Sequence, residues 1–387
     1  EGQDGAKDEQ ESFRWYRKAA EQGYAAAQFN VGEAYNLGKG VAKDEQESFR
    51  WYRKAAEQGN ATAQFNLGAM YSKGQGVNKD QQEAVRWYRK AAEQGDADAQ
   101  VNLGVRYDKG QGVAKDEQES LRWYRKAAEQ GHAAAQYSLG LMYAQGQGVA
   151  KNEQEAVRWY RKSAEQGYAS AQVNLGTMYY QGQGVTKNKQ EALRWYRKAA
   201  EQGNAAAQVN IGNEYLVEGG VFGADEKEAL RWYRMAADQG DPEALAYIGH
   251  AYAGGLGVKK DVQEAFIWYR KAAERGHAKA QLLLGLQLDK GQKSSQDKKE
   301  SVHWYRKAAD QGDRDAMFCL GLLYETGQSV TKSKVIAYAL NKTGLESSES
   351  PDKASLDRQM SLQTKMSPDE LKAATALALK MKKPGNH

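Results

Sequence analysis

Apolar side chains in residues 80–115 recur at intervals of three and four, with polar residues between them. This spacing is that of one face of an α-helix, and it predicts one helix from Asp80 to Glu93 and a second from Asp96 to Lys109. Gly95 suits the end of the first helix because glycine tolerates a positive φ, and Asp96 suits the N-cap of the second. The two stripes consist of Ala84, Trp87, Tyr88 and Ala91, and of Ala99, Leu103, Gly104 and Tyr107.

The same helix pair recurs along the sequence, and tryptophan marks each copy. The nine tryptophans are separated by 36 residues, with one step of 37, and a tyrosine follows each of them. A further step of 36 from Trp304 reaches Leu340, in a degenerate tenth copy. A fixed period of this length indicates a solenoid, in which each copy buries its apolar face against its neighbours. The series is Trp15, Trp51, Trp87, Trp123, Trp159, Trp195, Trp232, Trp268 and Trp304.

A different kind of segment follows the array. We expect the solenoid to occupy residues 1–344, and a linker with two capping helices to occupy residues 345–387. The helices are predicted at about 351–365 and 367–382, and the second begins with Ser-Pro-Asp-Glu, a capping box with proline at the first helical position. Such a divergent pair covers the last apolar face of a solenoid. At the other end, residues 2–23 match only part of a repeat, so we expect further sequence upstream of Glu1.

Composition changes the interpretation of chain length. A chain of 387 residues would favour two or three globular domains, but the repeat makes most of it one array. The 40 glycines and 4 prolines suit many short helices joined by glycine turns. The single cysteine, Cys319, excludes a disulfide framework and a multi-cysteine metal site. No run of 18 apolar residues is present that could span a membrane.

The repeated string resembles a known motif. Residues 99–113 read Ala-x-x-x-Leu-Gly-x-x-Tyr-x-x-Gly-x-Gly-Val, and residues 123–131 read Trp-Tyr-x-Lys-Ala-Ala-x-x-Gly. This pattern is similar to the bacterial type of Sel1-like repeat, a relative of the tetratricopeptide repeat. The resemblance implies an all-α, right-handed superhelical solenoid of antiparallel helix pairs with a C-terminal helical cap. It also implies a non-enzymatic adaptor that binds a protein partner on its concave face and needs no cofactor.

Few residues are candidates for catalysis or metal binding. The five histidines, at positions 132, 250, 277, 303 and 387, are not equivalent in the repeat, and no two have the i, i+4 spacing of a helical zinc site. Cys319 replaces an asparagine of earlier repeats, and the sequence identifies no base or orienting group that would make it a nucleophile. We therefore expect that the protein is not an enzyme and binds no metal.

A basic cluster of Arg86, Arg89 and Lys90 surrounds the Trp-Tyr pair and recurs in nearly every repeat. Acidic residues are interleaved with it, because Glu83 lies three residues before Arg86 and Glu93 four residues after Arg89. Such neighbours form exposed helical ion pairs, and the formal net charge is only +5. We interpret the cluster as a solvated face and expect no nucleic-acid partner. An acidic protein partner is the remaining alternative.

The helix that carries the Leu-Gly-Tyr stripe lines the concave surface if tetratricopeptide geometry applies. Positions on its other side differ between repeats, and they are apolar or aromatic in the middle of the array and polar on either side. Such a patch is typical of a protein-binding site, but the larger side chains could equally fill gaps between adjacent helices. The candidate partner-binding residues of this kind are Phe29, Glu33, Phe65, Asp108, Tyr137, Leu141, Tyr180, Asn213, Leu216 and His250.

Asparagine recurs at one position on the same helix. A side-chain amide donates and accepts hydrogen bonds, so a ladder of amides could clamp the backbone of an extended peptide. Alternatively, each amide bonds only to a neighbouring helix. The series, which Ser138 interrupts and Tyr247 ends, consists of Asn30, Asn66, Asn102, Asn174 and Asn210.

Two interpretations of function remain open. The first is an adaptor that holds a protein partner. The second is a bacterial immunity-type inhibitor that neutralises a secreted antibacterial effector, for example a type VI secretion phospholipase. An enzyme precedent exists in cysteine-rich Sel1-like proteins that act on β-lactams, but those carry a cysteine pair in each repeat, which this chain lacks. We expect a monomer in the unbound state and a bacterial, periplasmic location.

Overall fold

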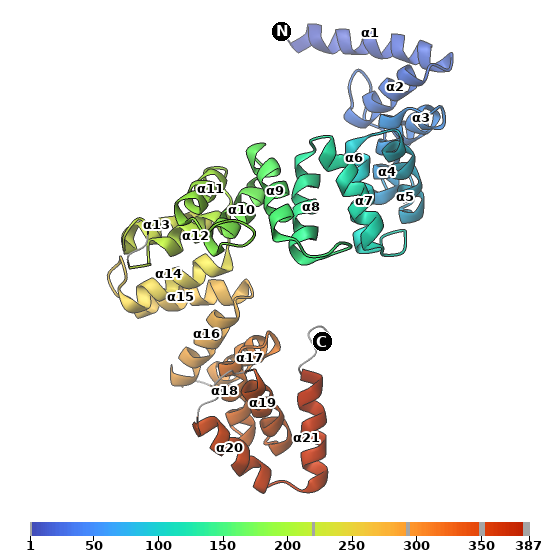
Figure 1. Cartoon of the computed structure of the whole chain (residues 1–387). Coiled ribbons are helices and arrows are strands. Elements are labelled where there is room, and N and C mark those ends of the chain that lie inside the picture. The colour runs from blue at the N-terminus through green and yellow to red at the C-terminus, as the bar shows by residue number, and fades with distance from the viewer. Residues whose placement is uncertain (1, 219–220, 292–294, 348–352, 382–387) are drawn as a thin grey trace. The chain divides into compact units, whose positions relative to one another are not determined.

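The computed structural model describes residues 2–218, 221–291, 295–347 and 353–381, with the backbone alone for residues 2–7, 291 and 295. Within these ranges every regular element is an α-helix (Figure 1). The chain forms two compact units, Glu1–Gln202 and Gly203–His387. The first unit contains α1 (Gly2–Glu21), α2 (Ala25–Leu37), α3 (Glu45–Glu57), α4 (Ala61–Lys73), α5 (Gln81–Glu93), α6 (Ala97–Lys109), α7 (Glu117–Glu129), α8 (Ala133–Gln145), α9 (Glu153–Glu165), α10 (Ala169–Gln181) and α11 (Lys189–Glu201). The second contains α12 (Ala205–Glu214), α13 (Glu226–Ala237), α14 (Pro242–Gly254), α15 (Val262–Glu274), α16 (Ala278–Gly291), α17 (Ser295–Asp310), α18 (Arg314–Thr326), α19 (Lys334–Glu346), α20 (Lys353–Thr364) and α21 (Pro368–Met381).

The all-α solenoid predicted from the sequence is confirmed. In each unit, consecutive helices pack against one another as pairs (Figure 1). We call the even-numbered helices α2 to α18 the A helices and the odd-numbered helices α1 to α19 the B helices. No helix in the described ranges is both long and apolar enough to cross a membrane.

Helices α5 and α6 show how local sequence sets the boundaries. The carboxylates of Asp80 and Asp96 accept hydrogen bonds from backbone N–H groups in the first turns of α5 and α6, which satisfies donors that have no partner within the helix. Gly110 ends α6 with a φ of 64°. In the following turn, a Cβ on Gly112 would collide with the backbone carbonyl of Gln81, so only glycine fits there.

The two rings of each Trp-Tyr pair belong to different buried clusters. The tyrosine lies on the A helix of its own pair, where a Cβ on Gly104 would be 2.9 Å from Cε1 of Tyr124. Trp123 is buried in a cluster with Val85 of α5 and Leu103 of α6, whereas Tyr124 is buried in the cluster that contains Leu139 of α8. The large tryptophan and tyrosine rings thereby pack against small alanines and glycines in the core, which explains why these types recur at fixed positions.

A ladder of glutamine side chains joins consecutive repeats, and the sequence reasoning missed it. Buried Gln100 donates from Nε2 to the carbonyl of Ala92 at 3.1 Å, and its Oε1 accepts from Nε2 of Gln130 at 2.8 Å. The series is interrupted at Leu245, and there the partner position, 30 residues later, holds Arg275 instead of glutamine. The pairs that form the glutamine ladder are Gln58–Gln28, Gln94–Gln64, Gln130–Gln100, Gln166–Gln136, Gln202–Gln172, Gln239–Gln208 and Gln311–Gln281.

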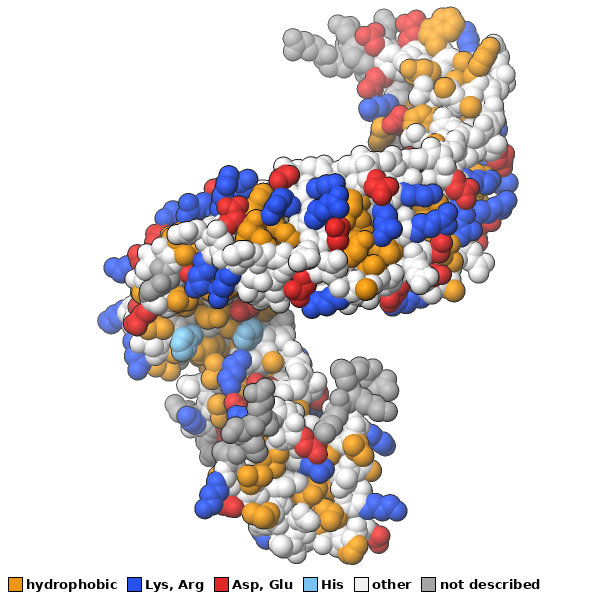
Figure 2. All heavy atoms as spheres, in the orientation of Figure 1, with side chains coloured by type: hydrophobic (Ala, Val, Ile, Leu, Met, Phe, Trp, Pro, Cys, Tyr) orange, Lys and Arg blue, Asp and Glu red, His pale blue; other side chains and the backbone are white. Residues whose placement is uncertain are grey.

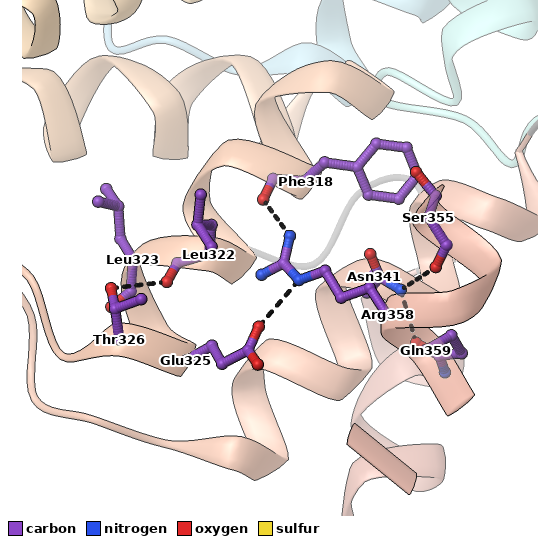
Figure 3. Close-up of polar contacts among 9 residues, drawn as sticks. All are labelled: Phe318, Leu322, Leu323, Glu325, Thr326, Asn341, Ser355, Arg358 and Gln359. Carbon is purple, nitrogen blue, oxygen red and sulfur yellow. Dashed lines mark hydrogen bonds and ion pairs between the residues drawn. The ribbon is translucent and has the colours of Figure 1, made fainter. Parts of the chain in front are cut away.

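Helices α20 and α21 pack on α19 at the end of the second unit. Figure 3 shows Arg358 of α20 reaching α18, where its Nε donates to Glu325 at 2.9 Å and its Nη1 donates to the carbonyl of Phe318 at 3.1 Å. Buried Asn341 of α19 donates to Gln359 at 2.8 Å. These helices correspond to the two expected after the array, while most of the segment between α19 and α20, where the linker is expected, lies outside the described residues. The domain boundary at 344/345 remains a prediction.

Candidate protein-binding surface

The candidate residues lie on the A helices or directly after them, on the side away from the Leu-Gly-Tyr stripe, and we call this the A-helix surface. None of them is fully buried. Phe29, Asn30, Phe65, Asn66, Asn102, Asp108, Tyr137, Leu141, Asn174, Tyr180, Asn210 and Asn213 are half-buried, and Glu33, Leu216 and His250 are exposed.

The aromatic residues of this surface serve partly as packing. The rings of Phe29 and Phe65 lie against Tyr52 and Tyr88, with centroids 5.6 and 5.8 Å apart. Each of these pairs joins an A helix to the B helix that follows it. The packing interpretation therefore applies to these side chains. Part of each ring stays accessible, and its role in partner binding remains a prediction.

The middle of the first unit brings Tyr137 and Leu141 together. Both pack on the buried cluster of α9 and α10, and the ring of Tyr137 lies 5.2 Å from that of Tyr168 and 6.0 Å from that of Tyr160. Tyr180 does not join this contact, and instead its ring lies under the ammonium group of Lys189 at 5.1 Å. Leu216 belongs to the second unit.

The asparagine ladder contacts tyrosine hydroxyls within the protein. Asn66 hydrogen-bonds to Tyr52, and Asn174 hydrogen-bonds to Tyr160. Burial raises the pKa of both tyrosines to about 12, and the asparagine contacts act in the opposite direction. Asn102 donates to a carbonyl of its own helix at 2.9 Å. These contacts support the structural interpretation of the ladder, and the peptide clamp remains a hypothesis.

The ends of the surface differ in character. In the first unit, Asn30 and Glu33 line a cavity of about 230 Å³ together with Tyr16. In the second unit, Asn213 accepts a hydrogen bond from the hydroxyl of Tyr233 at 2.7 Å.

A larger cavity, which the sequence analysis did not predict, opens between α14 and α16. It has a volume of about 320 Å³, and its apolar lining includes Ala246, Tyr247 and Leu283. Two histidines, His250 and His277, also line it, and Figure 2 shows two histidine side chains beside an apolar hollow in this region. Burial lowers the pKa of His277, which keeps this ring neutral at pH 7.

The basic cluster of the B helices is largely paired. Arg86 lies 3.1 Å from Glu83, as the spacing predicts, and Lys90 lies 4.1 Å above the ring of Trp87. Arg89 does not pair with Glu93 as its spacing suggested, but donates to the hydroxyl of Tyr107. Figure 2 shows basic and acidic side chains interleaved on the visible face. Exposed pairs of this kind contribute little to stability, and the arrangement supports a solvated face.

Cys319 has the environment of a packing residue. Its side chain is half-buried and packs at the edge of the apolar cluster that contains Leu320. Burial raises the pKa of its thiol to about 11, so the thiol is protonated at neutral pH and is a poor nucleophile. In the part of the chain that the structure describes, no group of three or more histidine, cysteine, aspartate and glutamate side chains is arranged to hold a metal ion.

Comparison with known proteins identifies the repeat. The Sel1 repeat family matches ten consecutive segments, 1–24, 25–60, 61–96, 97–132, 133–168, 169–204, 205–241, 242–277, 278–313 and 314–340. No curated protein matches the chain.

Two solved structures are similar over much of the chain. The protective antigen c5321 of uropathogenic Escherichia coli is 36% identical, with a TM-score of 0.67, over 95% of this chain and 86% of that one. A Sel1 repeat protein from Oxalobacter formigenes is 39% identical, with a TM-score of 0.53, over 60% of this chain and 92% of that one. The repeats cover most of the sequence, and the chain belongs to the Sel1 repeat family.

Proposed function

We propose that this chain is a non-enzymatic scaffold that holds a protein partner on its A-helix surface. Sel1 repeat proteins are protein-interaction scaffolds. The observation that carries the proposal is the contrast between positions within one chain. The residues that pack the repeats are nearly constant, whereas the A-helix surface changes in size, charge and polarity from repeat to repeat. Packing between repeats does not require that variation, whereas recognition of a partner with its own shape would require it.

The chemistry of the first unit suits a partner segment with apolar side chains. Helices α8 and α10 contain no charged residue, whereas α6 contains Asp98, Arg106, Asp108 and Lys109. An uncharged stretch that presents half-buried tyrosines loses little hydration when it is covered. The protonated thiol of Cys319 and the paired charges of the B helices support a function without catalysis and without nucleic acid.

Affinity capture from a lysate of the source organism tests the proposal. The full chain is compared with a variant that carries Glu33→Lys, Tyr180→Asp and His250→Asp on the A-helix surface. The control variant carries Arg86→Asp, Arg122→Asp and Arg231→Asp, at exposed positions of the B helices. We expect the A-surface variant to lose a specific partner at least tenfold, while the control retains it. Equal retention by both variants would contradict the proposed surface.

The adaptor and the inhibitor differ in stoichiometry. An inhibitor of a secreted effector would form one tight complex of fixed composition, and an adaptor would form several weaker ones. Light scattering of the purified chain and of its captured complexes measures both properties, together with the proposed monomeric state. Both similar structures come from bacteria, which supports a bacterial source, and cell fractionation tests the proposed periplasmic location.

A further inference from the structure

A small residue, Ala246, contributes to the cavity between α14 and α16. Ala246 occupies the repeat position that holds a ring in three earlier A helices (Phe29, Phe65 and Tyr137) and valine in the other three (Val101, Val173 and Val209), and it is the smallest of these side chains. In the three repeats that hold a ring, that ring covers the tyrosine of the following Trp-Tyr pair. Here the following tyrosine is Tyr269, and alanine is too short to cover it.

The exposure of the tyrosines follows this difference. Tyr52, Tyr88 and Tyr160, which the rings cover, are 2, 3 and 2% exposed, and Tyr124, Tyr196 and Tyr233, which follow the valines, are 6, 4 and 3% exposed. Tyr269, which follows alanine, is only half-buried and lines the cavity. The neighbouring Tyr247 does not cover it, because its ring stacks on Tyr233 of α13 with centroids 4.6 Å apart.

The structure assigns this cavity as an anchor site for one aromatic side chain of a protein partner. The inference rests on the proposed scaffold function and specifies its chemistry. The guest ring would cover Tyr269 in the way that the chain's own rings cover the equivalent tyrosines, at centroid distances of 5.6 to 6.0 Å. Aromatic pairs at this distance are favourable beyond the area that they bury.

The size and the rim of the cavity fit such a guest. A volume of about 320 Å³ lies at the small end of the range for ligand sites, which suits a single side chain. Around the apolar floor, His277 accepts a hydrogen bond from the backbone N–H of Ala280 through Nδ1 at 3.0 Å. The neutral ring then carries its proton on Nε2, a donor for a peptide carbonyl beside the guest side chain. Glu243 supplies an acceptor for a peptide N–H.

Ligand-observed NMR with small probes tests this assignment without a protein partner. The probes are N-acetyl-L-phenylalaninamide and, for comparison, N-acetyl-L-leucinamide. For a fragment of this size we expect a Kd on the order of 1 mM for the aromatic probe, and at least threefold weaker binding of the leucine probe.

The decisive variant is Ala246→Phe, which supplies the missing ring from within the chain. We expect it to weaken binding of the aromatic probe at least tenfold. Val173→Phe, at the equivalent position of α10, is the matched control and should leave binding unchanged. Thermal unfolding checks that both variants fold, and Ala246→Leu replaces Ala246→Phe if the latter unfolds at lower temperature.

Three results would overturn the assignment: no binding of the aromatic probe, equal binding to wild type and Ala246→Phe, or an equal loss in Val173→Phe. Since the probes involve no partner protein, such a result would leave the scaffold function standing. Conversely, if the probes bind as expected but the A-surface variant captures its partner normally, the cavity stands and the scaffold proposal fails.

Discussion

Replacing Gln100 with alanine should uncouple two neighbouring repeats. The side chain is 3% exposed and makes two hydrogen bonds, one to the carbonyl of Ala92 and one from Gln130. A buried hydrogen bond contributes about 1 kcal/mol net, so we expect a loss of about 2 kcal/mol for Gln100→Ala and about 1 kcal/mol for Gln130→Ala. The double variant should lose only about 2 kcal/mol, because the shared bond is removed once.

Hydrogen exchange measured by mass spectrometry on peptides of α5 to α7 is the assay. Local opening free energies are preferable to a single melting temperature, because repeat arrays can unfold in steps. The predicted coupling between Gln100 and Gln130 is about 1 kcal/mol. The pair Gln100→Ala with Gln202→Ala, which belong to different bonds of the ladder, is the control and should be additive. A coupling below about 0.3 kcal/mol would refute the role of the ladder in joining repeats.

Three further predictions follow from other contacts. Gly104→Ala should destabilise the chain by about 1–3 kcal/mol despite its better helix propensity, because its Cβ would lie 2.9 Å from the Tyr124 ring; a higher unfolding temperature would contradict the close approach. Arg358→Ala should increase hydrogen exchange in α20 selectively, since the ion pair with Glu325 is lost, while exchange in α5 stays unchanged as an internal control. Tyr52 has a pKa raised from 10.0 to about 12. The unfolded chain therefore releases its proton first, and stability that is intact below pH 10 should fall between about pH 10 and 12. Ultraviolet titration of tyrosine, compared with far-ultraviolet circular dichroism, measures this, and unfolding that is complete before pH 10 would contradict it.

The sequence was sufficient to predict the helices because each repeat carries its own signals. An N-cap such as Asp96 and a terminal glycine such as Gly110 act within a few residues, and the structure places them where the pattern predicts. Because the same signals recur through most of the chain, a helix boundary that is ambiguous in one repeat can be assigned from the others.

The sequence did not predict features that depend on a missing side chain or on pairs of residues that lie far apart in the chain. The small size of Ala246 and the turn of Tyr247 toward Tyr233 contribute to the cavity, and only the first of these facts is visible in the repeat alignment. The glutamine ladder joins residues that are 30 or 31 positions apart, and its signal in the sequence is the joint change to Leu245 and Arg275.

Site-specific photo-cross-linking tests the central claim most directly. A benzophenone amino acid is placed at Glu33 or His250 on the A-helix surface, and at Arg122 or Arg231 on the B helices, all of which are exposed. The scaffold account predicts that, in cells, the same partner protein is cross-linked from the A-surface positions and not from the B-helix positions. Cross-links that form only from Arg122 and Arg231 would contradict it.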